Sequence, residues 1–288
     1  MFLCLCFVFL LCSLANGVTN FVAGCSCQTS GCPVSDLKVF RSENGINWTA
    51  STTQVGGGNV NGVAFSPNSG RWVITGQGSS STYFSDDGDN WTNVTPSNMF
   101  TSVGLSVHFF EERNLWFVVG GDAPGTLIWK SNNGSTFTPA MEQPTGFRDI
   151  RTVAFNRLSG TFVASGRGNS SSGFARSFDG EVWQSFGSSN LFASGICSSL
   201  IFSYSSETWL AAGSIGGIAL IQSRDLVTWS PGFVFLCCFF FFFFFRFRFV
   251  CFFAFVSKFH SHACFENSVL FCFVLFCFLR FASFISFP

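Results

Sequence analysis

Hydrophobic and polar positions follow a pattern that recurs four times between residues 63 and 213. Each copy is 14 residues long and contains an apolar triplet, a polar turn, an aromatic residue, an apolar run and a final glycine. The copies span residues 63–76, 107–120, 153–166 and 200–213. Two apolar runs joined by a short polar turn predict a β-hairpin, and the apolar second run predicts a strand that is buried on both faces.

A shorter motif, here called the box, lies between these hairpins and occurs five times. It starts with serine, has Asp or Asn two residues later and ends with an aromatic residue, and the closing aromatics lie 43, 46, 46 and 46 residues apart. The acidic or amide side chain is suited to bond backbone amides in a tight loop, the glycine to take a positive φ, and the aromatic ring to hold the turn against an apolar layer. The box residues are Ser42, Asn44, Gly45, Trp48; Ser85, Asp87, Gly88, Trp91; Ser131, Asn133, Gly134, Phe137; Ser177, Asp179, Gly180, Trp183; and Ser223, Asp225, Trp229. Leu226 replaces the glycine in the fifth box, so we expect a strained turn or a turn of another type there.

A short β-prone run precedes every box, at residues 37–41, 82–84, 127–130, 174–176 and 219–222. Together with the hairpin and a strand that begins at the box aromatic, it makes four antiparallel strands per repeat. Four-stranded units at a period in the forties predict an all-β protein, a β-propeller. The repeats cover residues 37–231 as an opening half-blade and four full repeats, which indicates about five blades or a truncated six- or seven-bladed ring.

The boxes resemble those of the Asp-box, or BNR-repeat, propellers of the sialidase-like superfamily, in the short variant Ser-x-Asp/Asn-Gly-x-x-Trp/Phe. The resemblance covers residues 37–231 and implies that the boxes are structural and that any functional site lies on the opposite face. WD-repeat propellers rank second, because their Gly-His and Trp-Asp signatures are absent. The superfamily includes hydrolases, receptors and assembly factors, so the resemblance leaves function open.

The loops expected on the opposite face are 76–81, 120–125, 166–173 and 213–217. Equivalent positions at the entry to the first strand of each repeat differ between copies and are therefore free to serve function: Asn61, Leu105, Arg151 and Ser198. The charged residues that we place on this rim are Asp122, Arg148, Asp149, Arg151 and Arg167. An arginine cluster suits the binding of a carboxylate, and the alternative is a set of solvated loop charges.

The function predicted from the sequence is a scaffold that binds a protein or a glycan, without a cofactor or metal. The alternative is a sialidase-like glycoside hydrolase. That chemistry is implied to need three convergent arginines, a tyrosine nucleophile with a neighbouring glutamate, and an acid/base, whereas Tyr83 and Tyr204 fall near the box face and no Arg-Ile-Pro signature is present. His108 is interpreted as a packed core histidine.

Net charge is zero and only 10% of residues are charged, so nucleic acid is not an expected partner. Residues 1–17 predict a secretory signal peptide, with a short anchor or an incorrectly assigned start as alternatives. Five N-x-S/T sequons agree with a secreted protein: Asn47, Asn90, Asn93, Asn133 and Asn169.

Residues 18–36 form a lead that contains Cys25, Cys27 and Cys32, and Cys197 lies within the repeats. Disulfides, free thiols and a metal site are open interpretations, and four cysteines allow three disulfide pairings.

The tail, residues 232–288, contains seven consecutive phenylalanines at 239–245, followed by Arg246 and Arg248, and a second apolar run at 269–287. The apolar segment that contains the seven phenylalanines and the run at 269–287 are each long enough to span a membrane, so a membrane anchor is one interpretation. The others are the translation product of a T-rich nucleic acid and a buried part of the fold. A membrane partner is expected only if the tail is a genuine part of the protein.

Overall fold

The computed structural model describes residues 11–15, 18–24, 39–53, 55, 59–78, 80–100, 103–121, 126–168, 173–186, 195–215 and 218–231. The chain divides at Gly232 into two units, and every described residue belongs to the first, Met1–Gly232. Several predictions lie outside the described residues: those for Cys25, Cys27, Cys32, Asp122, Asn169 and the tail, 232–288.

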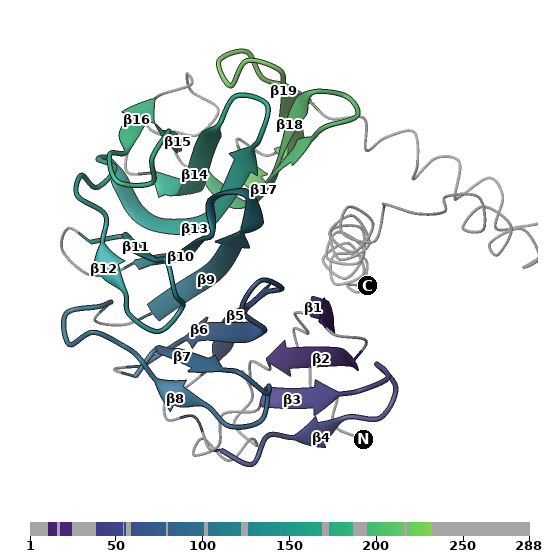
Figure 1. The fold of residues 1–288 in the computed structure, drawn as a ribbon. Helices are drawn as coiled ribbons and strands as arrows, with labels where there is room; N and C mark the ends of the chain where they lie inside the picture. Colours follow the sequence, from purple (N-terminus) through teal and green to yellow (C-terminus); the bar gives the residue numbers. More distant parts are fainter. Residues whose placement is uncertain are drawn as a thin grey trace, which may run out of the picture. The chain divides into compact units, whose positions relative to one another are not determined.

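The described residues form antiparallel meanders of four strands, in which each strand pairs with the next along the chain (Figure 1). Five meanders are present in this part of the chain. The first contains β1 (Leu11–Ala15), β2 (Val18–Gly24), β3 (Val39–Ser42) and β4 (Thr49–Ala50), and the second β5 (Val60–Ser66), β6 (Arg71–Gly76), β7 (Thr82–Ser85) and β8 (Thr92–Asn93). The third contains β9 (Val103–Phe110), the 3-10 turn η1 (Glu111–Arg113), β10 (Leu115–Gly121), β11 (Ile128–Ser131) and β12 (Thr138–Pro139). The fourth contains β13 (Phe147–Asn156), β14 (Thr161–Gly168), β15 (Phe174–Ser177) and β16 (Gln184–Phe186), and the fifth β17 (Ile196–Ser203), β18 (Thr208–Ile215), β19 (Ile218–Ser223) and β20 (Ser230–Pro231).

The last three meanders are joined edge to edge into one sheet. One residue pair links the third to the fourth, Gly121↔Asp149, and one links the fourth to the fifth, Arg167↔Ile196. The prediction of an all-β fold built from antiparallel sheets is confirmed.

The first meander differs from the expected half-blade, because β1 and β2 supply its missing two strands. Phe21 pairs with the box serine Ser42 as Trp72 pairs with Ser85, so residues 11–24 are a further copy of the hairpin. The dipeptide Asn16-Gly17 between two apolar runs is the sequence signal that could have identified it. Cleavage after Gly17 stays a prediction, and it would remove β1.

The second strand of each later meander lies in the core, as its apolar sequence predicts. All seven residues of β10 are buried, as are the last five of β6. An aromatic pair recurs between the first and second strands, with ring centroids 4.5–4.9 Å apart. The pairs are Phe65–Trp72, Phe109–Trp116, Phe155–Phe162 and Phe202–Trp209. Aromatic pairs at this spacing contribute about 0.5–1.5 kcal/mol beyond the area that they bury, so the repeat is stabilised from within each meander.

Candidate functional site

The five boxes share one hydrogen-bonded turn. The serine Oγ accepts the N–H of the fourth box residue at 2.8–2.9 Å and donates to the Asp or Asn Oδ1 at 2.8–3.2 Å. That Oδ1 also accepts the next two backbone N–H groups, at 2.7–3.0 Å. In three boxes the closing tryptophan donates its Nε1–H to the carbonyl of the fourth residue. These contacts occupy most of the polar atoms of the turn, so the box is a structural element.

The fifth box keeps this turn although it lacks glycine. Leu226 has φ +65°, close to the +70° of Gly45 and the +78° of Gly180 at the same position. A residue with a Cβ is strained in this region by about 1–2 kcal/mol. The expected strain is therefore present, in a turn of the same type.

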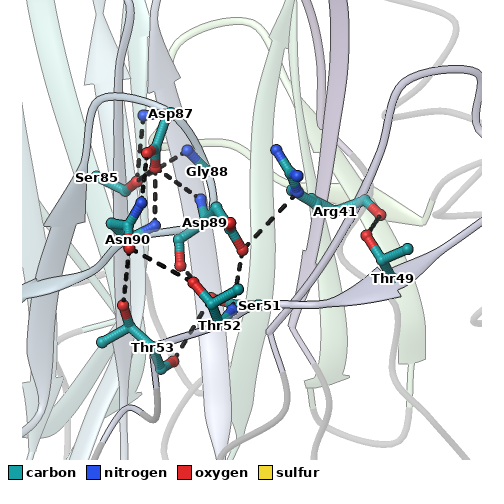
Figure 2. A network of polar contacts seen from close by, with 10 residues as sticks. All are labelled: Arg41, Thr49, Ser51, Thr52, Thr53, Ser85, Asp87, Gly88, Asp89 and Asn90. Atoms are coloured by element: carbon teal, nitrogen blue, oxygen red, sulfur yellow. Dashed lines mark hydrogen bonds and ion pairs between the residues drawn. The ribbon is translucent and has the colours of Figure 1, made fainter.

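Figure 2 shows that the second box also makes hydrogen bonds and an ion pair with the first meander and the residues that follow it. The N–H of Thr52 donates to Asp89 Oδ1 at 2.9 Å, and Ser51 Oγ donates to the Asp89 carbonyl. Arg41 Nε lies 3.8 Å from Asp89 Oδ1, and Asn90 Oδ1 accepts the hydroxyl of Thr52 at 3.4 Å. The joint is therefore made by a backbone N–H, hydroxyls and one ion pair.

The same ion-pair position recurs between the third and fourth meanders, where Lys130 pairs with Glu181. Lys130 and Arg41 both directly precede a box serine, and Glu181 and Asp89 are both the fifth residue of the following box. The fifth position of these two boxes thus makes contacts between successive repeats.

Hydrogen bonds lower the pKa values of the box carboxyls. At Asp87, desolvation by itself raises the pKa, but donors from Asn90 and the turn backbone outweigh it and bring the pKa well below 3.8. At Asp225, the N–H groups of Thr228 and Val227 lower the pKa to about 2. At Asp179, the N–H groups of Val182 and Glu181 lower it in the same way. All three carboxylates are ionised at neutral pH.

Four predicted glycosylation sites lie among the described residues: Asn47, Asn90, Asn93 and Asn133. All four side chains are exposed. Asn90 also donates its Nδ2–H to Asp87 Oδ2 at 2.8 Å, and Asn133 is the amide that organises its own box. Attachment of a glycan is sterically open at these positions and stays a prediction.

The four positions that vary between repeats are β-bulges. The pairing of the first strand with the second skips the equivalent residue in each of the four later meanders, and these residues are Asn61, Leu105, Arg151 and Ser198. In the fourth meander the pairing also skips Arg148. Bulges redirect side chains and are common beside binding sites.

The bulge also explains the final glycine of the hairpin pattern. A Cβ on Gly76 would lie 2.0 Å from the Asn59 carbonyl oxygen, and one on Gly166 2.1 Å from the Asp149 carbonyl oxygen. Both distances are far too short for a real contact, so only glycine fits opposite the bulge.

An ion cluster lies at the bulge of the fourth meander, close to its junction with the third. Asp149 is 4% exposed, and its Oδ1 contacts Arg151 Nε at 2.8 Å while its Oδ2 contacts an Nη of Arg167 at 2.9 Å. Gly121 makes room for this carboxylate, because a Cβ there would lie 2.4 Å from Asp149 Cβ. The structure brings these three rim residues together, and the neighbouring Arg148 is exposed.

His108 joins the third meander to the fourth. Its Nε2 accepts the N–H of Val153 at 3.3 Å and lies 2.9 Å from Ser106 Oγ. Burial lowers its pKa from 6.5 to about 4. The ring is neutral at physiological pH, in keeping with a structural histidine.

Cys197 carries a free thiol with no exposed surface, and a free thiol is one of the three interpretations that the sequence leaves open. Burial raises its pKa to about 11, so it is not a reactive thiolate. Within the described residues no three His, Cys, Asp or Glu side chains are arranged to bind a metal ion. The same residues include no helix with the length and hydrophobicity needed to cross a bilayer.

No protein-family model matches this chain, and no curated protein matches it. Among solved structures, the chain is similar to the GH74 xyloglucanase from Xanthomonas campestris, with a TM-score of 0.56 and 17% sequence identity over 74% of this chain and 36% of that one. It is also similar to a chain of a nidogen/laminin complex, with a TM-score of 0.50 and 11% identity over 70% of each chain. The aligned region is thus well under two thirds of the xyloglucanase. Both neighbours are β-propellers, and the likeness supports a β-propeller fold for this chain.

Proposed function

We propose that this protein is a binding scaffold that presents the bulge-bearing end of its sheets to a protein or glycan with an acidic group. The observation that carries the proposal is the cluster of Asp149, Arg151 and Arg167. Two guanidinium groups share one carboxylate, so the cluster has a net charge of about +1.

The cluster is preorganised for an anion. Asp149 is buried and holds one nitrogen of each arginine, while the side chains of Arg151 and Arg167 remain 27% and 34% exposed. A guanidinium has five N–H donors, so each arginine keeps donors for a ligand. Side chains fixed before binding lose less conformational entropy when the ligand arrives.

The two structural neighbours support binding to either class of partner. The nidogen/laminin complex is a protein assembly that contains a propeller, and the GH74 xyloglucanase is a glycoside hydrolase. The xyloglucanase also favours hydrolysis as the alternative function. Glycoside hydrolysis commonly needs two carboxyl groups about 5–9.5 Å apart, whereas both oxygens of Asp149 are held by arginines. We therefore place binding first.

Three finer properties complete the proposal. We infer that the boxes are of the short Asp-box type, that the repeats belong to a ring of about five blades or more, and that the protein is secreted. The common hydrogen-bonded turn supports the short Asp-box type. The succession of four-stranded meanders supports the ring, and the exposed sequons support secretion. Sequencing the amino terminus of protein exported from a eukaryotic host, and endoglycosidase treatment, would test secretion.

The binding proposal is tested with the full chain on immobilised carboxylated oligosaccharides, neutral oligosaccharides and acidic peptides. Arg151→Ala and Arg167→Ala should each weaken binding to the carboxylated probes about tenfold or more, because a hydrogen bond to a charged group contributes about 1.5–3 kcal/mol. Arg224→Ala removes an exposed arginine from the fifth box and is the matched control.

Equal binding by all three variants would refute the proposal. Release of new reducing ends from xyloglucan by the wild type would favour the hydrolase instead. Thermal unfolding of each variant separates lost binding from lost folding.

A further inference from the structure

A small pocket lies in the second meander, at the end where β6 turns into β7. Its polar lining comes from Asn59, Thr75, Gln77, Ser80, Ser81 and Tyr83. Tyr83, which we expected near the box face, belongs to this opposite end. The pocket has room for about one water molecule.

Ser81 leaves a polar atom in this pocket without a partner. The residue is 2% exposed, and its Oγ makes no hydrogen bond to any of the described residues. A buried hydroxyl without a partner costs about 1–3 kcal/mol. A molecule that hydrogen-bonds to Ser81 Oγ is therefore favoured in the pocket.

The lining also indicates the charge of that molecule. It contains hydroxyls and amides together with the apolar Val55, Val60 and Ile74, and none of the lining residues that the structure describes is charged. A buried ion without a counter-charge is strongly disfavoured, so the occupant is neutral.

The third meander supplies an internal comparison. The N–H of Gly76 donates to the Ser81 carbonyl at 2.8 Å, and the equivalent Gly120 donates to the Leu127 carbonyl at 3.1 Å. Ser81 thus occupies the position of Leu127, whose side chain is 5% exposed and part of the core. The pocket exists because serine is much smaller than the leucine of the neighbouring repeat.

We propose that this pocket is a subsite for one neutral hydroxyl group, filled by water in the free protein and by a glycan hydroxyl in the bound state. The binding of a glycan hydroxyl rests on the proposed binding function, since the pocket lies at the same end of its meander as the bulged residue Asn61. Hydroxyl groups are the one feature that water and a neutral sugar share, and both donate and accept hydrogen bonds.

The test uses crystals of the full chain, with and without methyl β-D-glucopyranoside, and calorimetric titration of the same sugar. We expect an ordered water on Ser81 Oγ in the free protein and a sugar hydroxyl in its place after soaking. Ser81→Ala keeps the space but removes the hydroxyl, and it should weaken sugar binding about tenfold. Ser81→Leu copies the third meander, fills the pocket and should abolish binding, and Ser97→Ala at an exposed turn position is the control.

Sugar binding that is unchanged in Ser81→Leu would overturn the subsite, and so would a pocket without water in the free protein. An ordered water without any sugar binding would overturn its role toward ligand and leave the arginine-based function standing. Because the probe is neutral, its binding does not depend on Arg151 or Arg167, and failure of that proposal is seen separately. Should Ser81→Leu fail to fold, the Ser81→Ala titration still decides the outcome.

Discussion

Lowering the pH should loosen the contact between the third and fourth meanders through His108. Its Nε2 accepts the N–H of Val153, and since a backbone N–H can only donate, the ring proton resides on Nδ1. Protonation of Nε2 would place two donors against each other.

The magnitude follows from the pKa of His108, which burial lowers from 6.5 to about 4. The folded state resists the proton, so the stabilisation is complete above pH 6.5 and is lost as the pH falls toward 4. At about 1.4 kcal/mol per pH unit, the difference corresponds to about 3 kcal/mol of unfolding free energy. A loss of this size is a large fraction of the stability of a typical domain.

The assay is urea unfolding followed by tryptophan fluorescence, at pH values between 4 and 7.5. The unfolding free energy of the wild type should fall across this range, and that of His108→Gln should vary much less, because glutamine stays neutral. Carboxyl groups that titrate near pH 4 affect both proteins and cancel in the comparison. His260 and His262 are the other two histidines of the chain, and replacing both with glutamine should leave the pH dependence of the wild type unchanged. Parallel pH profiles for wild type and His108→Gln would refute the reasoning.

Three further predictions concern single substitutions measured by chemical unfolding. Gly45→Ala should lower the free energy of unfolding by about 1–2 kcal/mol because of its positive φ alone. Gly180→Ala should lower it by about 1–3 kcal/mol more, because the added Cβ would lie 2.7 Å from Phe117 Cζ. Equal losses in the two variants would contradict this prediction. Gly121→Ala should lower the free energy of unfolding by at least about 2 kcal/mol, because the added Cβ would clash with Asp149, and it should weaken binding to carboxylated probes. Unchanged stability and binding would show that the contact between Gly121 and Asp149 adapts to the extra methyl group. Asp87→Asn should fold at pH 7, because Asn44 holds the same position in the first box. Below pH 3.8 the variant should lose less stability than the wild type, since the low pKa of Asp87 makes the stabilisation by this carboxylate acid-sensitive. An equal loss of stability in acid would count against the hydrogen-bonded carboxylate.

The periodic sequence predicts the fold well because each repeat carries its own local signals. The box and the hairpin pattern are short-range features, and both appear in the structure in the order expected. The first hairpin was missed because its apolar residues 11–15 also fit the pattern of a signal peptide. Apolar runs of this length fit both a signal peptide and a strand, and Asn16-Gly17 is the feature that points to the hairpin.

The candidate sites were harder to predict because they depend on strand pairing and on side-chain differences between repeats. The sequence placed Asp149 and Arg151 near one another, but the approach of Arg167 requires the pairing of β13 with β14. The pocket at Ser81 exists because serine is smaller than leucine. This difference is recognised only when Ser81 is aligned with Leu127, the equivalent residue of the next repeat.

The bulge accounts for the division of labour between the two ends of each meander. At the box end, backbone N–H groups and a serine hydroxyl saturate the Asp or Asn side chain, so a change there removes hydrogen bonds from the turn itself. At the other end, the skipped residue lies outside the regular pairing of β-strands, and the steric requirement falls on the glycine across from it. The bulged position can therefore hold Asn61 in one repeat and Arg151 in another without altering the sheet, which allows a single repeated architecture to carry different chemistry at each blade.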